Sequence, residues 1–253
     1  MIPLTQLSLL VTDLDNTLVG NDKALHQLLS LLDRYRQTHG TKIVYATGRS
    51  RALYQELAET AGLLEPDALI ASVGTEIYLQ DSLTPSSDWI DKFSGNWQRE
   101  QIVSILSQFA DLESQPASEQ RPFKVSYYLS TSVAAAVITQ LEQLLKRAEL
   151  DVEIIYSGSR DLDIVPQGAN KGRAVEFMRE IWQISAVNTA VCGDSGNDIS
   201  LFKYGQERGI IVGNAQPELR LWHQLHQADY HYLAVADYAA GIMEGLKYFR
   251  FIE

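Results

Sequence analysis

Apolar runs with the length of buried strands alternate with segments of helical periodicity at both ends of this 253-residue chain. The first run, residues 7–11, is followed by a helical segment near residues 23–38, whose leucines form one stripe and which stops at Gly40. This alternation is typical of β-α-β units, which bury a parallel sheet between helices. Because it holds over residues 1–79 and again over 162–253, we expect these two segments to form one parallel-sheet core domain.

The middle of the chain differs from these flanking segments. Turn formers dominate residues 80–87, and a helical segment follows near residues 96–109. After a second loop come two strands, near residues 123–129 and 152–156, with a further helix between them. We therefore expect an α/β fold in which residues 80–161 form a smaller α/β cap domain inserted into a Rossmann-like core. The alternative is that this insert extends the core sheet.

Two aspartates, Asp13 and Asp15, stand one residue apart just after the first apolar run. In parallel α/β folds, the loops that leave the carboxyl ends of the strands carry the chemistry. Two carboxylates side by side repel each other and are costly to bury, so they need a cation, a shared proton or a catalytic use. The alternative is a solvated turn, where Asp residues are common.

Three further polar clusters occupy similar places in the sequence. Residues 47–49 and 194–198 each follow an apolar run, and Lys171 begins a helical segment. Each cluster also has an ordinary interpretation, since Thr47 can cap a helix and Lys171 can be a solvated surface lysine. Four such clusters in one chain favour a common site.

The order and residue types of these clusters resemble the haloacid dehalogenase superfamily of phosphatases. The resemblance implies that Asp13 is the nucleophile and that Asp15 is the general acid and base. It implies that Thr47 and Lys171 hold the phosphoryl oxygens. A lysine at a helix start suits this role, because backbone amides and the helix dipole already favour an anion there.

The same resemblance implies a Mg²⁺ site. Mg²⁺ prefers oxygen ligands and keeps some of its waters, so no His or Cys is needed. The expected ligands are the carboxylates of Asp13 and Asp194, a backbone carbonyl near Asp15, and the phosphate of the substrate. Asp198 could complete the site through water, hold Lys171 in place, or cap a helix.

Further segments narrow the resemblance to the short bacterial sucrose-phosphate phosphatases. Arg160 stands where we expect a lysine in that family, so the charge is kept and the hydrogen-bond geometry is not. The resemblance implies Mg²⁺-dependent hydrolysis of sucrose 6-phosphate. The segments that carry it are residues 73–78, 124–127, 157–163, 166–167 and 214–218.

A disaccharide phosphate needs polar and aromatic side chains that recognise hydroxyl groups. Tyr127 and Tyr128 are neighbours on an expected strand and must point to opposite faces, so at most one faces a pocket unless the strand bulges. Arg49 has an alternative role as the partner of an acid such as Glu76. Besides Thr47 and Lys171, the residues predicted to bind substrate are Gly48, Arg49, Glu76, Lys124, Tyr127, Arg160, Gln167 and Asn197.

Composition excludes several kinds of partner. The 21 basic and 32 acidic residues give a net charge of −11, which argues against nucleic acid or an anionic membrane surface. Cys192 is the only cysteine, so no intrachain disulfide can form. No apolar stretch approaches the ~20 residues that cross a bilayer, and we expect a cytoplasmic protein that acts on a small sugar phosphate.

Other functions remain open. A phosphatase for another glycosyl phosphate, such as mannosyl-phosphoglycerate or trehalose 6-phosphate, would share the core motifs, and so would a phosphomutase. A non-catalytic phosphosugar-binding partner of sucrose-phosphate synthase is an alternative of another class. The presence of both Asp13 and Asp15 counts against it, although a complex with the synthase is compatible with an active enzyme as well.

Overall fold

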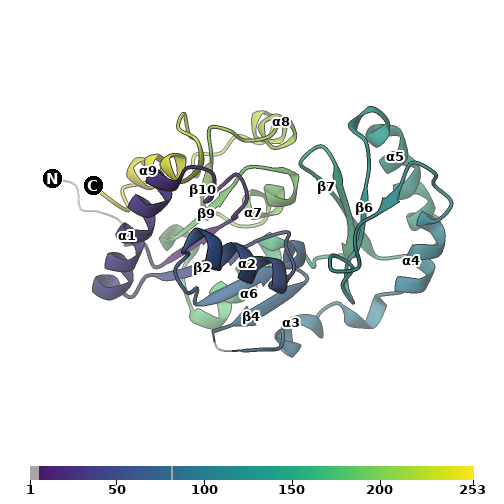
Figure 1. Ribbon diagram of the computed structural model, residues 1–253, viewed down its shortest axis with the longest axis horizontal. Coiled ribbons are helices and arrows are strands. Elements are labelled where there is room, and N and C mark those ends of the chain that lie inside the picture. Colours follow the sequence, from purple (N-terminus) through teal and green to yellow (C-terminus); the bar gives the residue numbers. More distant parts are fainter. Residues whose placement is uncertain (1–5, 81) are drawn as a thin grey trace.

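The computed structural model describes residues 6–80 and 82–253 and places two β-sheets side by side along the longest axis of the molecule (Figure 1). The larger sheet has seven strands and the smaller has four. Each sheet has its own helices and its own hydrophobic clusters. The expected α/β fold, a parallel-sheet core with a smaller second α/β unit, is confirmed.

The larger sheet is parallel except at one edge. Its central strand, β1 (Leu9–Thr12), pairs in parallel with β2 (Lys42–Ala46) and β9 (Thr189–Gly193). Thr12, the last residue of β1, lies opposite residues near the ends of both neighbours, so the three carboxyl ends meet at one edge of the sheet. The outer strands are the parallel β3 (Ala68–Ala71), β10 (Arg208–Ile211) and β11 (His231–Leu233), and the antiparallel β4 (Glu76–Leu79).

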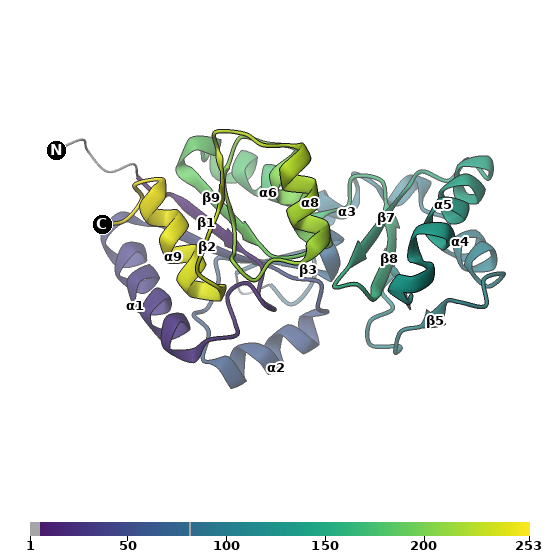
Figure 2. The same ribbon diagram turned by 90° about the horizontal axis from the view of Figure 1, so that it is seen from above.

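Helices cover both faces of this sheet (Figure 2). The helix α1 (Asp22–His39) buries one stripe that includes Leu25 and Leu28 and stops at the left-handed Gly40, as its sequence predicted. It begins after Asn21, whose side chain caps it. On the same face lie α2 (Arg51–Ala61) and α9 (Tyr238–Tyr248), and on the other lie α6 (Lys171–Trp182), α7 (Ile199–Lys203) and α8 (Pro217–Leu225). Short helices are α3 (Ser87–Ile90), η1 (Ser72–Gly74), η2 (Ser94–Asn96), η3 (Ala186–Asn188) and η4 (Gly196–Asp198).

The smaller sheet is antiparallel and has two chemically different faces. Its order is β5 (Glu113–Ser114), β6 (Val125–Tyr128), β8 (Asp161–Pro166) and β7 (Val152–Ser157). Apolar side chains of alternate positions, such as Val125 and Leu162, pack under the helices α4 (Arg99–Leu106) and α5 (Thr131–Arg147). The intervening positions, such as Ser126 and Asp163, therefore present a polar face away from these helices.

The chain returns to the core later than the sequence pattern predicted, because β8 belongs to the smaller sheet. The sequence pattern predicted a core segment from residue 162 onward, but β8 pairs with β6 on one side and β7 on the other. We therefore place the return after Pro166 and treat the unit built around the smaller sheet as the cap. Alternating residues such as those of β8 suit either sheet, because period-2 polarity does not identify the partner strand. None of the helices in the described ranges is long and apolar enough to cross a membrane.

Candidate active site

The paired aspartates leave the central strand at the edge where the carboxyl ends meet. Asp13 directly follows β1, is 4% exposed, and its backbone N–H donates to the carbonyl of Cys192 at 3.0 Å. Asp15 is on the surface side of the same loop, with a side chain that is 44% exposed. One carboxylate is thus buried and the other open, an arrangement that gives two identical side chains different environments.

Lys171, the first residue of α6, points into the carboxylate cluster. Its Nζ donates to the Oδ1 atoms of Asp13, Asn197 and Asp198, each at 2.7 Å. The lysine is 0% exposed, which rules out the solvated surface lysine that the sequence allowed. Burial lowers the pKa of Lys171, but the neighbouring carboxylates outweigh this effect and raise it above its ordinary value.

Asp198 has two of the roles that its sequence left open. Its Oδ1 accepts from Lys171, while its Oδ2 accepts from the backbone N–H groups of Asp194 at 2.9 Å and Ser195 at 3.1 Å. It therefore both holds the lysine and caps η4, where Ser195 completes a capping box. Because Oδ2 already accepts two hydrogen bonds, only Oδ1 has capacity left for a metal or for a water bound to one.

Asp194 is the carboxylate best placed to receive a cation. Its Oδ1 accepts from the Thr17 hydroxyl at 3.1 Å, but its buried Oδ2 has no hydrogen-bond partner among the described residues. Asp13, Asp194 and Asp198 offer oxygens within 4.8 Å of one another, and Lys171 is the cation inside this group. Three carboxylates and one ammonium leave an excess of two negative charges, which a divalent cation would balance.

Burial also makes the two carboxyl groups beside Lys171 costly to ionise, as their pKa values show. Burial raises the pKa of Asp13 to about 7, partly offset by Lys171. Burial, with the charges of Asp198 and Asp13, raises the pKa of Asp194 to about 9. Without a cation these groups favour the protonated form, whereas oxygen ligands of a metal are deprotonated. The residues present therefore fit a divalent metal ion.

The second polar loop, residues 47–49, lies beside the first. Arg49 donates from Nε and Nη2 to the two carboxylate oxygens of Asp15, both at 2.7 Å. This hydrogen bond is the largest cause that raises the pKa of Arg49. Thr47 is fully buried, and Ser50 rather than Thr47 is the N-cap of α2, so the capping interpretation of Thr47 is wrong. Arg49 pairs with Asp15 and not with Glu76.

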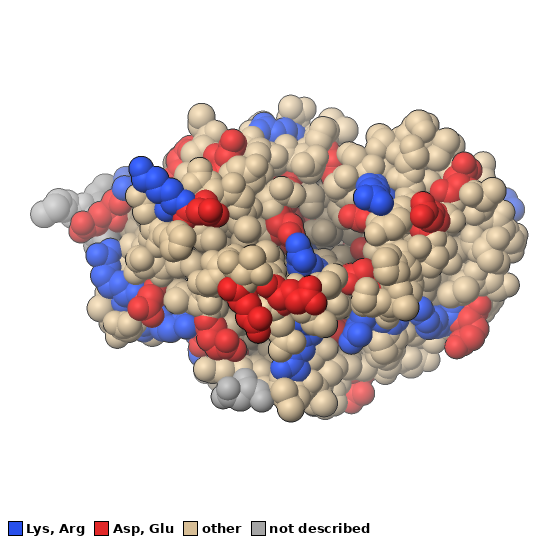
Figure 3. Space-filling view, in the orientation of Figure 1, with Lys and Arg blue, Asp and Glu red and all other residues tan. Residues whose placement is uncertain are grey.

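A cavity of about 440 Å³ connects these loops to the polar face of the cap sheet. Figure 3 shows a hollow between the two units, bordered by side chains of both charges. The core wall includes Asp13, Asp15, Asn16, Gly48, Arg49, Asp194, Ser195 and Asn197, and the cap wall includes Gln115, Glu119, Lys124, Tyr128, Ser157, Gly158, Asp161 and Asp163.

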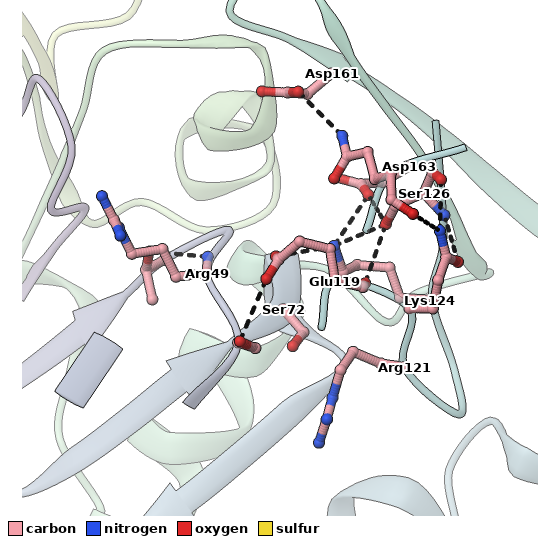
Figure 4. Close-up of polar contacts among 12 residues, drawn as sticks. Arg49, Ser72, Glu119, Arg121, Lys124, Ser126, Asp161 and Asp163 are labelled. Atoms are coloured by element: carbon pink, nitrogen blue, oxygen red, sulfur yellow. Dashed lines mark hydrogen bonds and ion pairs between the residues drawn. The ribbon is translucent and has the colours of Figure 1, made fainter. Parts of the chain in front are cut away.

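The cap wall centres on the buried side chain of Lys124 (Figure 4). Its Nζ donates to the Ser126 hydroxyl at 2.8 Å and to Asp163 Oδ1 at 3.1 Å, and the Ser126 hydroxyl donates to the same Asp163 oxygen at 2.5 Å. Glu119 lies next to this group and accepts from the Ser50 hydroxyl of the core at 3.3 Å. A buried lysine and carboxylate on a cavity wall form a fixed set of donors and acceptors.

Four of the residues predicted to bind the sugar, Glu76, Tyr127, Arg160 and Gln167, do not line the cavity. Tyr127 is buried in the hydrophobic cluster of the cap, while Tyr128, on the other face of β6, lines the cavity. Gln167 is exposed and lines grooves on the outside of the molecule instead. Arg160 stacks on the Tyr128 ring, 4.0 Å from its centroid.

Glu76 is a contact between the core and the cap rather than part of the cavity wall. Its carboxylate accepts from Arg121 Nε at 2.8 Å and from the Tyr78 hydroxyl at 2.9 Å. Arg121 belongs to the chain segment of the cap, so this ion pair joins the two units. Glu76 is 4% exposed, which makes the pair a structural link beside the site.

The sequence analysis missed six cap residues that line the cavity: Gln115, Glu119, Ser157, Gly158, Asp161 and Asp163. Asp161 and Asp163 alternate with the apolar Leu162 and Ile164, a pattern that would have marked one polar face of a strand. Gln115 and Glu119 precede β6 in a loop with no periodicity, and no sequence signal marked them.

The core sheet, the buried aspartate after its central strand and the cap sheet above the cavity agree with the haloacid dehalogenase superfamily, and a putative HAD-like hydrolase of Nitrosococcus oceani is 32% identical to this chain, with 95% of this chain and 71% of that protein covered. The model of one family within this superfamily, described as sucrose-6F-phosphate phosphohydrolase, matches residues 6–250. The chain belongs to this family.

Individual relatives agree with this assignment. A probable sucrose-phosphatase 2 of Arabidopsis thaliana is 39% identical over 252 residues, covering 96% of this chain and 59% of that protein, so the chain spans about six tenths of this plant relative. A mannosylfructose-phosphate phosphatase of Agrobacterium fabrum is 31% identical, with 96% of both chains covered. The crystal structure of the sucrose-phosphatase from Synechocystis, in complex with sucrose and phosphate, has a TM-score of 0.92 at 39% identity, covering 98% of this chain and 100% of the other.

Proposed function

We propose that the protein is a Mg²⁺-dependent phosphatase that hydrolyses sucrose 6-phosphate to sucrose and phosphate. The observation that carries the proposal is one cavity with two unlike ends, a buried charge cluster on the core side and a polar sheet face on the cap side. The family match and the Synechocystis structure support the choice of substrate. The volume of about 440 Å³ lies within the range of small-molecule sites, ~300–1,000 Å³.

In the first step, the Asp13 carboxylate attacks phosphorus. A bond forms between this oxygen and phosphorus, and the bond from phosphorus to the sugar oxygen breaks. Asp15, in its protonated form, gives its proton to the departing sugar oxygen. Arg49 donates to both carboxylate oxygens of Asp15, so the bound substrate must displace this guanidinium, or share it with Asp15, before Asp15 can protonate the sugar oxygen.

In the second step, the aspartyl phosphate on Asp13 is hydrolysed. Asp15, now a carboxylate, takes a proton from water while the water oxygen attacks phosphorus, and phosphate leaves with Asp13 restored. Asp15 thereby regains the proton that it gave to the sugar, and the 44% exposure of its side chain supports this assignment because water can reach it. Asp13 is almost fully buried, as a nucleophile that must avoid competing hydration should be.

Other groups hold charge in place during both steps. Lys171 keeps Asp13 oriented through the 2.7 Å contact and presents its positive charge to the phosphoryl oxygens. A bound Mg²⁺ would neutralise the repulsion between the anionic nucleophile and the anionic substrate. Asp13 and Asp194 would hold it, Asp198 would act by keeping Lys171 and the 194–198 loop in position, and Thr47 would bind a phosphoryl oxygen.

The test is phosphate release with and without Mg²⁺ across a panel of sugar phosphates. The panel contains sucrose 6-phosphate, trehalose 6-phosphate, mannosyl-phosphoglycerate, glucose 6-phosphate and fructose 6-phosphate, with excess chelator as the control. We expect a metal-dependent preference for sucrose 6-phosphate of about 100-fold in kcat/KM. A flat profile would remove the substrate assignment, and no turnover of any member would favour a phosphosugar-binding role.

A second candidate substrate is mannosylfructose phosphate. The relative with that activity in its name matches this chain along almost its whole length, as the sucrose-phosphatase of Synechocystis does. Both compounds are disaccharide phosphates, so the polar cap wall would serve either. Adding mannosylfructose phosphate to the panel decides between them, and a free-sugar acceptor assay tests the phosphomutase alternative. The complex with sucrose-phosphate synthase stays a prediction.

A further inference from the structure

The cap strand β7 reaches the catalytic lysine at a point away from the cavity. Glu153, on β7, accepts a hydrogen bond from Asn170 Nδ2 at 2.7 Å. Asn170 is 0% exposed and immediately precedes Lys171. β7 is an edge strand of the cap sheet and lies on the side that faces the core in Figure 1. A cap residue therefore touches the start of the helix that carries the lysine.

Asn170 has a defined task at this helix start. It is the N-cap of α6, and its Oδ1 accepts from the backbone N–H of Arg173 at 3.0 Å. Its amide can make this bond only if the oxygen points toward the helix and the nitrogen points away. A carboxylate accepts and cannot donate when it is ionised, so Glu153 fixes the amide in this orientation. The Tyr204 hydroxyl, 3.4 Å from the same nitrogen, is a weaker second partner.

The backbone around Lys171 is packed so closely that few other contacts could adjust it. A Cβ on Gly74 of η1 would lie 2.2 Å from the carbonyl carbon of Asn170, and one on Gly172 would lie 2.0 Å from the carbonyl oxygen of Ser200. Glycine at both places lets the neighbouring backbone approach the lysine from two sides. The side chain of Asn170 links this closely packed start of α6 to the cap.

A second contact from the same strand supports this link. Ser157, four residues after Glu153 and on the same face of β7, lines the cavity. Asn197 Nδ2 donates to its hydroxyl at 3.4 Å, and Asn197 Oδ1 accepts from Lys171. The strand thus touches the surroundings of Lys171 at both ends, once through Asn170 and once through Asn197.

We propose that Glu153 is a positioning residue for the phosphoryl-transfer site, which holds the N-cap amide of Asn170 and thereby the catalytic Lys171. The inference rests on the proposed function of Lys171. The inference gives the cap a second role besides sugar recognition. The strand β7, which lines the cavity, also fixes the position of Lys171, and Lys171 in turn holds Asp13 and the phosphoryl group. The effect of Glu153 should fall on the chemical step and should not depend on the sugar.

The test compares Glu153→Ala with Glu153→Gln and with Glu142→Ala, an exposed glutamate of the same outer groove. We measure kcat and KM with Mg²⁺ for sucrose 6-phosphate and for p-nitrophenyl phosphate, which has no sugar. We expect Glu153→Ala to lower kcat about tenfold on both substrates with little change in KM, since small displacements of a catalytic group carry large costs. Glu153→Gln should retain most of the activity, because its amide oxygen can accept from Asn170, and Glu142→Ala should match the native protein.

A reversed pair keeps the inference testable if Glu153→Ala does not fold. In the single variant Asn170→Asp, the new carboxylate faces the carboxylate of Glu153, and activity should fall. Adding Glu153→Gln reverses donor and acceptor in this contact, so the double variant should recover activity. Unchanged kcat in Glu153→Ala, an effect on sugar KM alone, or no recovery in the double variant would overturn the inference. If the native protein hydrolyses p-nitrophenyl phosphate but no sugar phosphate, the proposed substrate fails and the positioning role is still measured.

Discussion

The core wall and the cap wall of the cavity differ in how their buried charges are arranged. On the core wall, Asp13, Lys171 and Asp198 are buried charges that touch one another at 2.7 Å and leave net negative charge. On the cap wall, Lys124 and Asp163 are also buried and a neutral hydroxyl joins the pair, while Glu119 and Asp161 add two further carboxylates to the wall. The core wall brings three carboxylates within 4.8 Å of one another, which suits a metal and a phosphoryl group, whereas the separate donors and acceptors of the cap wall suit hydroxyl groups. Perturbing each wall should therefore give different losses on substrates with and without a sugar.

The largest effect is expected at the nucleophile on the core wall. Asp13→Asn keeps the shape of the side chain but removes the attacking carboxylate, so turnover should fall by about 10⁴-fold or more on both sucrose 6-phosphate and p-nitrophenyl phosphate. Initial rates of phosphate release measure this, with Asp33→Asn on α1 as the matched control. A variant that keeps near-native activity would remove Asp13 from the nucleophile role.

The next effect separates the general acid from the nucleophile. Asp15→Asn cannot protonate a sugar oxygen, so kcat on sucrose 6-phosphate should fall by about 10²–10⁴-fold. The loss on p-nitrophenyl phosphate should be smaller, because nitrophenolate leaves without a proton. The ratio of the two losses, measured in parallel assays, is the decisive quantity, and equal losses would contradict general-acid catalysis by Asp15.

A change on the cap wall should depend on the sugar. Lys124→Met leaves Asp163 buried without its cation, which should lower the free energy of unfolding by about 3–5 kcal/mol. In protein that remains folded, kcat/KM should fall by about 10–200-fold for sucrose 6-phosphate and much less for p-nitrophenyl phosphate. Urea unfolding and steady-state kinetics measure the two effects, with Lys146→Met on the exposed side of α5 as control. Equal losses on both substrates would show that the two walls do not act separately.

The smallest expected effect is on stability as pH changes. In metal-free protein the folded-state pKa values, about 7 for Asp13 and about 9 for Asp194, lie above the usual carboxyl values, so the folded state binds more protons than the unfolded state. The contribution of these two groups to the free energy of unfolding is therefore fully present at low pH and is lost as the pH rises toward 9. Mg²⁺ should raise the Tm more at pH 8.5 than at pH 5, and an equal rise at both values in thermal melts would contradict this.

Much of the core wall could be predicted before the structure was known. Asp13 and Lys171 are 158 residues apart in sequence but touch, because each lies next to a strand or helix end at the same edge of a parallel sheet. The places of the four clusters in the sequence favoured a common site, and the family resemblance gave Asp13 and Lys171 their roles in it. The alternatives for Asp198 were resolved only by its partners, since a carboxylate can cap a helix and hold a lysine at once.

The cap wall was predicted less well, for reasons of strand register. The choice between Tyr127 and Tyr128 depends on which face of β6 packs against α4 and α5, and both residues are equally compatible with a strand. Gln167 follows the last strand of the cap and turns outward, which local sequence does not encode. The partners of β8 depend on strands about 10 and 40 residues earlier in the chain, so the return to the core was placed too early.

The sequence by itself determined the α/β alternation, the four polar clusters and their order, because buried strands, helix stripes and loop carboxylates are local properties of residue type. The tertiary structure alone decided which tyrosine faces the cavity and which oxygen of Asp194 has no partner among the described residues. It also decided that Glu153 contacts Asn170, the N-cap residue of α6. These outcomes depend on distances between segments far apart in the chain. Packing and strand pairing set those distances, and no short stretch of sequence contains them.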